Sequence, residues 1–322
     1  MNLRHIRIHP KIQVVLKMCI GVALLVALVK YIDLNTLRQS VERANTVYLG
    51  IGLSLVVANL AMQFLRWRYL LTLLSSTTSN EDALSSMLVG FSTGFFTPGQ
   101  IGEHGGRIVM LRSLQPIQVL ACSIIDKIYL LVVTILVGAV ASWLYCSRYL
   151  PQYWTISLSA VVAALVVSSI VLVMFPEILK KILRSVLHKV KKYRAVSSFL
   201  FMKDVFHRKQ ARVLLFLTFA FYFVIILQYH FFVLAFEPVR LDTSALCTAN
   251  ILFIKSAFLP ISFGDLGVRE STSIFFFSRA GVSAASAFNA SLCIFFVNIL
   301  LPSLAGSLVL LRSKGAKGKK QP

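Results

Sequence analysis

The chain has 322 residues, of which 57% are hydrophobic and 14% are charged, and its formal net charge is +21 at pH 7. This composition excludes a soluble globular domain, which could not bury so much apolar sequence. The basic residues lie between apolar segments, so an anionic lipid surface explains the charge better than nucleic acid does. We therefore expect an all-α polytopic membrane protein whose partners are anionic membrane lipids.

Two apolar segments begin the chain. Residues 12–32 follow a group of basic residues and lack a small-residue cleavage pattern, so they predict an uncleaved span with a cytoplasmic N-terminus. Residues 46–65 predict a second span. It ends at Arg66-Trp67-Arg68-Tyr69, a basic and aromatic group that is typical of the cytoplasmic interface of a membrane.

A shorter apolar segment, residues 83–96, cannot cross a hydrocarbon core of about 30 Å, which needs about 20 helical residues. A stretch with one proline and four glycines follows at residues 96–107, and a third span is expected at residues 117–145. If residues 83–115 crossed the membrane, the most basic loop of the chain, with 11 Lys and Arg residues between positions 180 and 212, would lie outside. We therefore expect a re-entrant hairpin that enters from the cytoplasm and returns to it.

Three further spans are expected in the second half of the chain. Before the second of them, residues 176–210 carry apolar residues with a period near four among lysines, which is typical of an amphipathic helix on an anionic leaflet. The basic tail, residues 312–322, belongs in the cytoplasm and is expected to be disordered. This orientation forces residues 243–281 into a second re-entrant hairpin that enters from the outside. The expected spans are 154–175, 213–236 and 283–311.

The two halves of the chain therefore have the same order of elements. Residues 12–149 and 153–311 each contain two spans, a hairpin and a last span, in opposite orientations within one transmembrane domain. The hairpin motifs also repeat: counted from Pro98 and from Pro260, glycine follows at +4, an acid at +5, glycine at +7 and arginine at +9. Six spans and two broken hairpins in such an inverted-topology repeat are typical of transporters, whose substrates bind at the breaks.

Ionisable residues at membrane depth are costly, so those at the breaks are candidates for a binding site. Arginines at helix starts, Arg107 and Arg269, could each bind a phosphate with two parallel hydrogen bonds. The adjacent acids could orient these arginines or carry coupling protons, and glycines could let the phosphate approach the backbone. The candidate substrate-binding residues are Pro98, Gly102, Glu103, Arg107, Pro260, Gly264, Asp265, Arg269 and Glu270.

A structural interpretation of the same residues stays open. Each motif places its acid four residues before its arginine, so each pair could be an internal ion pair that holds a bent hairpin together. Secondary candidates for the site are Asp126 and Lys127 in the third span and Lys255 in the second hairpin, although Asp126 and Lys127 could neutralise each other. Asparagines and Gln63 within the spans could form interhelical hydrogen bonds.

The sequence offers little for catalysis or cofactor binding. It has no GxSxG, HExxH or P-loop motif, and its five cysteines are scattered without a CxxC pair. We expect no enzyme, no catalytic residue, no metal and no cofactor.

The segments TPGQIGEHGGR and LPISFGDLGVRE at the two breaks resemble the flippase-like transmembrane region of the lysylphosphatidylglycerol synthases, a family that includes the multiple peptide resistance factor. The resemblance extends from about residue 11 to about residue 312. It implies lipid translocation in the cytoplasmic membrane, with two hairpins around a headgroup cavity. Family synthases carry a further aminoacyl-transfer domain, so the resemblance implies a stand-alone form here. The resemblance also implies a small residue such as glycine directly after Gly264, whereas this chain has Asp265 at that position.

We therefore expect a protein that moves an anionic phospholipid or a lipid-linked headgroup across the cytoplasmic membrane of a bacterium or archaeon, with both termini cytoplasmic. One alternative is a membrane subunit without transport of its own, which recruits a lipid-modifying enzyme or a glycosyltransferase through residues 176–210. Another alternative, an intramembrane enzyme that acts on a lipid phosphate, lacks a set of residues for a nucleophile.

Overall fold

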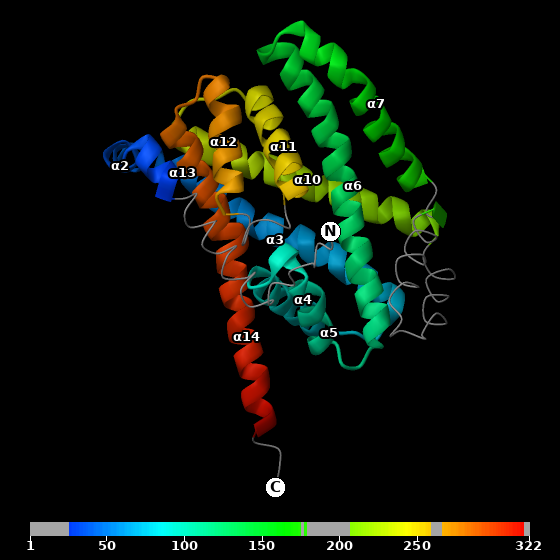
Figure 1. The fold of residues 1–322 in the computed structure, drawn as a ribbon. Helices are drawn as coiled ribbons and strands as arrows, with labels where there is room; N and C mark the ends of the chain where they lie inside the picture. Colours follow the sequence, from blue (N-terminus) through cyan, green and yellow to red (C-terminus); the bar gives the residue numbers. More distant parts are fainter. Residues whose placement is uncertain (1–25, 175–176, 179–206, 259–265, 319–322) are drawn as a thin grey trace, which may run out of the picture.

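The computed structural model describes residues 26–174, 177–178, 207–258 and 266–318. These residues form helices and connecting turns without any strand, as the sequence predicts (Figure 1). The elements are α2 (Leu34–Glu42), α3 (Thr46–Leu74), α4 (Asn80–Phe95), η1 (Pro98–Gln100), α5 (Gly102–Met110), α6 (Pro116–Tyr149), α7 (Gln152–Met174), α10 (Arg208–Phe236), α11 (Leu241–Phe258), α12 (Val268–Arg279), α13 (Ala284–Phe295), η2 (Phe296–Leu300) and α14 (Leu301–Gly318).

Within the described ranges, five helices are long and apolar enough to cross a membrane. They correspond to the predicted second to sixth spans: α3, α6, α7, α10 and the continuous path of α13, η2 and α14. The chain is thus a multi-pass membrane protein by the length and composition of its helices. The predicted first span, residues 12–32, lies mostly outside the described residues, and so does nearly all of the predicted amphipathic segment 176–210.

Two pairs of shorter helices occupy the positions of the predicted breaks. Helix α4 packs against α5 before the third span, and α11 packs against α12 before the last one. In Figure 1 the first pair lies toward the lower end of the molecule and the second pair toward the upper end. The turn between α11 and α12 lies largely outside the described residues, which excludes Pro260, Gly264 and Asp265 from the description.

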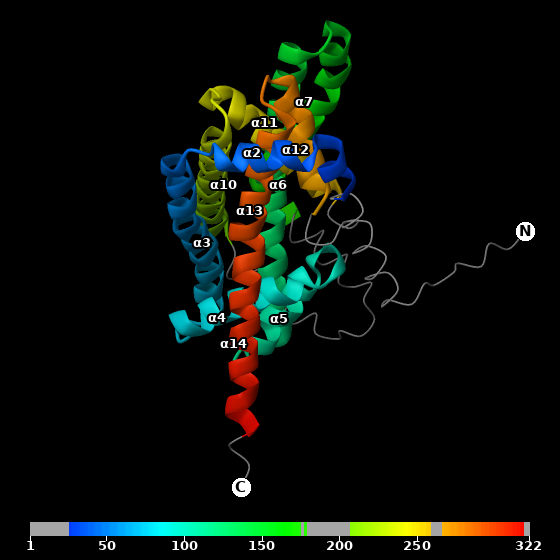
Figure 2. The ribbon, with the colours of Figure 1, turned by 90° about the vertical axis from the view of Figure 1, so that its left-hand side faces the viewer.

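Corresponding elements of the two halves make corresponding contacts. Helix α3 packs against its counterpart α10, and Figure 2 shows the two side by side. Helix α4 packs against α14, while α11 packs against α6, so each hairpin lies against the last long helix of the other half. In Figure 1, α6 rises as its residue numbers increase whereas α13 and α14 descend. The two halves therefore make equivalent contacts between hairpin and long helix. Their last long helices, α6 in the first half and α13 with α14 in the second, run in opposite directions.

Small residues bring each hairpin close to its neighbouring long helix, as is typical of helix packing in membranes. A Cβ atom at Gly306 of α14 would overlap the carbonyl of Leu88 in α4. Nearby, the hydroxyl oxygens of Ser92 and Ser307 lie 2.7 Å apart in a hydrogen bond. On the other side, a Cβ atom at Gly138 of α6 would overlap the side chain of Phe253 in α11. Both hairpins are thus held against the long helices by contacts that leave no room for larger residues.

At the start of α11, an exposed ion pair adds a further contact with α6. A guanidinium nitrogen of Arg148 lies 3.2 Å from the carboxylate of Asp242. The backbone N–H of Thr243 and the Arg148 guanidinium lower the pKa of the Asp242 carboxyl. Exposed pairs of this kind contribute little to stability.

Candidate functional site

The first break is a tight turn that the hydroxyl groups of Thr93 and Thr97 stabilise, and the Thr93 hydroxyl donates a hydrogen bond of 2.7 Å to the carbonyl of Gly102. Pro98 begins the single turn η1, and Gly99 and Gln100 have positive φ angles of 62° and 57°. Glycine adopts this conformation readily, whereas glutamine rarely does. The Thr97 hydroxyl accepts a hydrogen bond of 2.7 Å from the backbone N–H of Gly102, where α5 begins. The turn therefore ends α4 and restarts the chain as a helix within seven residues, Phe96 to Gly102.

Gly102 serves the packing of the hairpin itself. A Cβ atom at this position would overlap the carbonyl of Thr93 and lie 2.6 Å from the hydroxyl of Thr97, both of which belong to the α4 side of the hairpin. The space that we predicted for a phosphate beside Gly102 is thus filled by protein. Gly105 differs, because no atom lies within 4 Å of the corresponding Cβ position.

Five ionisable residues from α3, α5 and α6 form an ionic cluster. The two carboxylate oxygens of Glu103 lie 2.7 Å from Arg107 Nη2 and 2.6 Å from Lys127 Nζ. The two oxygens of Asp126 lie 2.6 Å from Arg66 Nη2 and 3.3 Å from Arg107 Nη1. Three cations against two carboxylates leave this cluster with a formal charge of +1.

Lys127 is the member of the cluster that reaches open space. Its side chain is 33% exposed, whereas no other side chain of the cluster exceeds 9%. The Arg107 guanidinium, by contrast, stacks on the ring of Trp67 with its Cζ atom 4.0 Å from the ring centre. The geometry thus favours the internal ion pair of Glu103 and Arg107 that the sequence left open. It also shows Asp126 and Lys127 with different partners, so they do not neutralise each other.

Arg66 and Trp67 are not the exposed interface anchors that the sequence predicts. Both side chains are buried, at 3% and 0% exposure, and α3 continues beyond them to Leu74. The physical reason is that Arg66 supplies the closest cation to the buried Asp126 carboxylate. Asn59, Gln63 and Arg66 follow one another at helical spacing on α3, and this polar stripe was the signal that could have identified Arg66.

At the second break, Arg269 and Glu270 are both buried and contact each other. Glu270 Oε1 accepts hydrogen bonds from Arg269 Nη2 at 2.8 Å and from the Ser291 hydroxyl at 3.2 Å. Glu270 Oε2 accepts one from the backbone N–H of Gly267, the N-cap residue that precedes α12 and has a positive φ of 82°. Asp265, the partner that we predicted for Arg269, lies outside the described residues. Among the described residues, Arg269 pairs with the adjacent Glu270 and also donates a hydrogen bond to the Ser291 hydroxyl.

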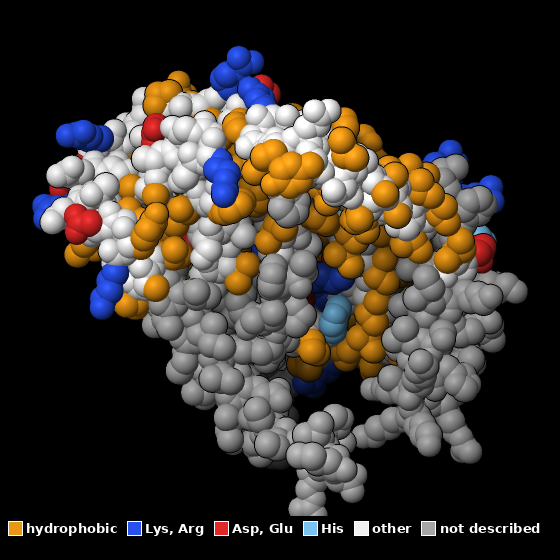
Figure 3. Space-filling model, turned by 45° about the horizontal axis from the view of Figure 1, so that its top comes forward, with side chains coloured by type: hydrophobic (Ala, Val, Ile, Leu, Met, Phe, Trp, Pro, Cys, Tyr) orange, Lys and Arg blue, Asp and Glu red, His pale blue; other side chains and the backbone are white. Residues whose placement is uncertain are grey.

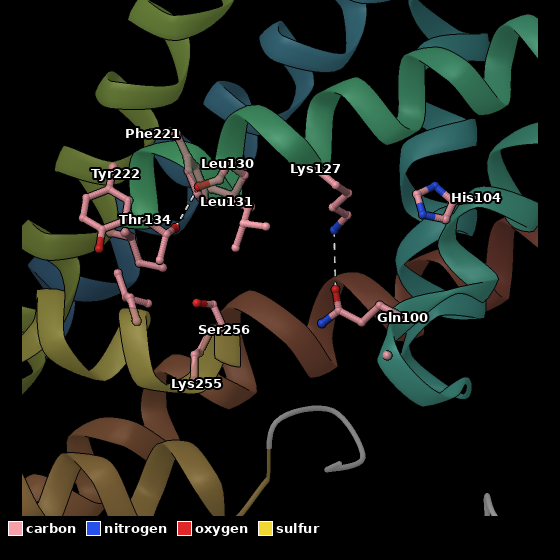
Figure 4. Close-up of a pocket in the computed structure, with 13 residues that line it drawn as sticks. Gln100, His104, Lys127, Leu130, Leu131, Thr134, Phe221, Tyr222, Lys255 and Ser256 are labelled. Atoms are coloured by element: carbon pink, nitrogen blue, oxygen red, sulfur yellow. Dashed lines mark hydrogen bonds between the residues drawn. The ribbon is translucent and has the colours of Figure 1, made fainter. Parts of the chain in front are cut away.

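Two adjoining cavities lie where the two halves meet. The larger has a volume of about 340 Å³ and the smaller about 160 Å³, and Figure 4 shows the larger one. Lys127 and Lys255, which were secondary candidates from the sequence, line both cavities. Glu103 and Arg269 line the smaller cavity, whereas Arg107 lines neither. Asp126 and Glu270 line neither as well. Figure 3 shows a hollow on one face, where basic side chains and a histidine lie among apolar ones.

The walls of the larger cavity combine polar and apolar groups. Gln100, which has the unusual positive φ, accepts a hydrogen bond of 3.4 Å from Lys127. His104 lies beside them, with its Nδ1 atom 2.7 Å from the Ser123 hydroxyl. The remaining wall is mostly apolar and includes Leu130, Leu131, Phe221, Ile225 and Leu252. A cationic end next to an apolar wall can hold the charged head and part of the chains of an anionic amphiphile.

A family model for the lysylphosphatidylglycerol synthase TM region matches residues 14–306. The chain belongs to this family. Comparison with curated proteins gives no match, and comparison with solved structures gives none either. Membership in the synthase TM-region family agrees with the multi-pass helices and with a role connected to membrane lipids. The matched range contains both hairpins and every residue of the ionic cluster.

In this member of the synthase TM-region family, amide side chains connect the long helices around the smaller cavity. Asn298, in the π-helical turn η2, donates a hydrogen bond of 2.7 Å to Gln228 of α10. Gln228 also accepts one of 3.4 Å from Asn59 of α3, and Asn59 accepts one of 2.8 Å from Gln63. The predicted interhelical hydrogen bonds are confirmed for Asn59 and Asn298, whereas Gln63 bonds to Asn59 within α3 itself. The sequence did not single out Gln228, which joins the two halves of this chain.

Proposed function

We propose that this member of the lysylphosphatidylglycerol synthase TM-region family translocates an anionic phospholipid or a lipid-linked anionic headgroup across the cytoplasmic membrane of a bacterium or archaeon. The observation that carries the proposal is the larger cavity, where Lys127 extends the +1 charge of the ionic cluster into a space with apolar walls. An unbalanced charge in a low-dielectric site is costly unless an opposite charge accompanies it. A lipid phosphate would supply that charge.

The proposal assigns the contact with the headgroup to the two lysines. Lys127 and Lys255 come from opposite halves of the chain and line the same two cavities. A lysine ammonium is a flexible point charge, which suits a ligand that must bind and then leave. Arg107 and Glu103 would hold the first hairpin in place. Arg269 lines the smaller cavity and keeps its predicted role as a phosphate ligand within this proposal.

The proposal includes the topology of six spans with two re-entrant hairpins in an inverted repeat and both termini in the cytoplasm. The exchange of contacts between the halves supports it, as do the opposite directions of α6 and of α13 with α14. Hairpins that enter from opposite sides would meet near the middle of the membrane. In transporters with such repeats, rocking of one half against the other exposes the central site to each side in turn.

The first experiment is a measurement of lipid movement in liposomes that contain the purified protein. Fluorescent lipids with anionic and zwitterionic headgroups are placed in both leaflets, and an impermeant quencher reports how fast the inner-leaflet lipid reaches the outside. We expect faster movement of the anionic lipids than in protein-free liposomes, and a smaller effect on the zwitterionic ones. Rates equal to those of protein-free liposomes for every headgroup would contradict the proposal.

That negative result would favour the alternative from the sequence, a non-transporting subunit that recruits a lipid-modifying enzyme or a glycosyltransferase. Its support is the basic segment with 11 Lys and Arg residues between positions 180 and 212. We propose no catalytic activity for the chain itself.

A further inference from the structure

The larger cavity has one polar group in its wall that the proposed function does not use, the hydroxyl of Tyr222. Tyr222 belongs to α10, is 3% exposed and lines the cavity. Its hydroxyl has no hydrogen-bond partner among the described residues. Buried polar atoms are almost always hydrogen-bonded, because an unmade bond leaves the cost of desolvation uncompensated. We therefore expect the Tyr222 hydroxyl to form a hydrogen bond with a ligand that enters the cavity.

The other hydroxyl side chains in the cavity wall already donate their hydrogens to the protein. Thr134 donates to the carbonyl of Leu130 at 2.8 Å, a bond that Figure 4 shows as a dashed line. Ser256 donates to the carbonyl of Phe253 at 2.7 Å. Each hydroxyl has a single hydrogen to donate. Among the described hydroxyls of the wall, Tyr222 is thus the donor that remains available to a ligand.

The positions of the polar groups define two ends of the cavity. In Figure 4, Gln100, His104 and Lys127 lie toward one end and Tyr222 lies toward the other. Leu130 and Leu131 lie between them on one side of the cavity, and Lys255 and Ser256 on the other. A ligand that occupies the whole cavity would place a negative charge near Lys127. It would also place an oxygen that accepts a hydrogen bond near Tyr222.

We propose that Tyr222 donates a hydrogen bond to an uncharged acceptor oxygen of a bound anionic lipid and thereby contributes to lipid specificity. The inference rests on the proposed function, because it takes the cavity as the lipid site. An ester carbonyl and a headgroup hydroxyl both offer such an oxygen. In a low-dielectric cavity, a lipid without that oxygen would leave the tyrosine hydroxyl unpaired and would bind less tightly.

The test compares lipid binding by the wild type and by Tyr222→Phe, which removes only the hydroxyl. The full chain is purified in detergent and titrated with phosphatidylglycerol, and native mass spectrometry measures the bound fraction. We expect Tyr222→Phe to raise the Kd about five- to tenfold, the effect of one neutral hydrogen bond. Tyr145→Phe is the matched control, because the Tyr145 hydroxyl donates to the Phe276 carbonyl at 3.2 Å and does not line the cavity. Its Kd should equal that of the wild type.

Two further lipids identify the acceptor. Ether-linked phosphatidylglycerol lacks the ester carbonyls, and phosphatidic acid lacks the headgroup hydroxyls. The difference between wild type and Tyr222→Phe should vanish with the ether lipid if a carbonyl is the acceptor, and with phosphatidic acid if a hydroxyl is. A difference that persists with both lipids would make the phosphate the acceptor and would overturn the assignment.

The outcomes separate this inference from the function on which it rests. Equal Kd values of wild type and Tyr222→Phe for phosphatidylglycerol would overturn the role of Tyr222 and leave lipid translocation standing. Failure of the wild type to bind any anionic lipid would overturn both. Thermal unfolding of the lipid-free proteins gives a second measurement. If Tyr222→Phe unfolds at a lower temperature than the wild type, the hydroxyl has a partner within the protein, and the inference fails.

Discussion

Glu103 and Arg107 form the centre of the ionic cluster, and their neighbours determine what each contributes. Glu103 contacts two cations, Arg107 and Lys127, while Arg107 is one of two cations that contact Asp126. Removal of Arg107 would leave each carboxylate with one remaining cation. Removal of Glu103 would leave Asp126 as the single carboxylate against three cations, which raises the cluster charge from +1 to +2.

We therefore predict an order of stabilities for these variants. Glu103→Gln should cost about 3–5 kcal/mol, as is usual when a buried charge loses its partner, and Arg107→Gln should cost less. The double variant returns the cluster to +1 and should be more stable than Glu103→Gln alone. Thermal unfolding in detergent measures the order. Greater instability of Arg107→Gln than of Glu103→Gln would show that the cluster is not balanced in this way.

At the scale of elements, the position of each hairpin depends on close contact with a long helix. The strongest constraint is Gly306, where α14 meets the backbone of α4 at Leu88. Gly306→Ala should destabilise the protein by about 1–3 kcal/mol, because an inserted methyl group must displace a packed backbone. Gly50→Ala is the control, since no atom lies within 4 Å of its Cβ position. Equal melting temperatures of the two variants would argue against tight packing of the first hairpin.

The elements that local sequence determines were predictable, and their contacts were not. Apolar length identified the five long helices, and proline with glycines identified the breaks. The polar stripe of Asn59, Gln63 and Arg66 could mark a buried face of the helix, but the partner of Arg66 is Asp126, which lies 60 residues away in the chain, so no local pattern could identify that partner. Likewise, Gly102 packs against its own hairpin, whereas the motif alone suggested space for a ligand. Lys127 was a candidate, but only the fold shows that it faces the cavity.

At the scale of the whole molecule, the proposed topology places the ends of the two hairpins on opposite sides of the membrane. Ser113 follows α5 and Ser278 lies near the end of α12, and both are exposed. In a cysteine-free background, Ser278→Cys should react with an impermeant thiol reagent added to intact cells, and Ser113→Cys should react only after the cells are opened. Labelling of Ser113→Cys from outside would mean that the first hairpin crosses the membrane.

The central claim is that the cavity selects anionic lipid through the charge of Lys127. The most direct measurement is the ratio of anionic to zwitterionic lipid movement in liposomes, for wild type, Lys127→Gln and the charge-preserving Lys127→Arg. A hydrogen bond to a charged group contributes about 1.5–3 kcal/mol, so Lys127→Gln should lower the ratio about tenfold or more. Lys127→Arg should keep most of it. An unchanged ratio in Lys127→Gln would contradict the account.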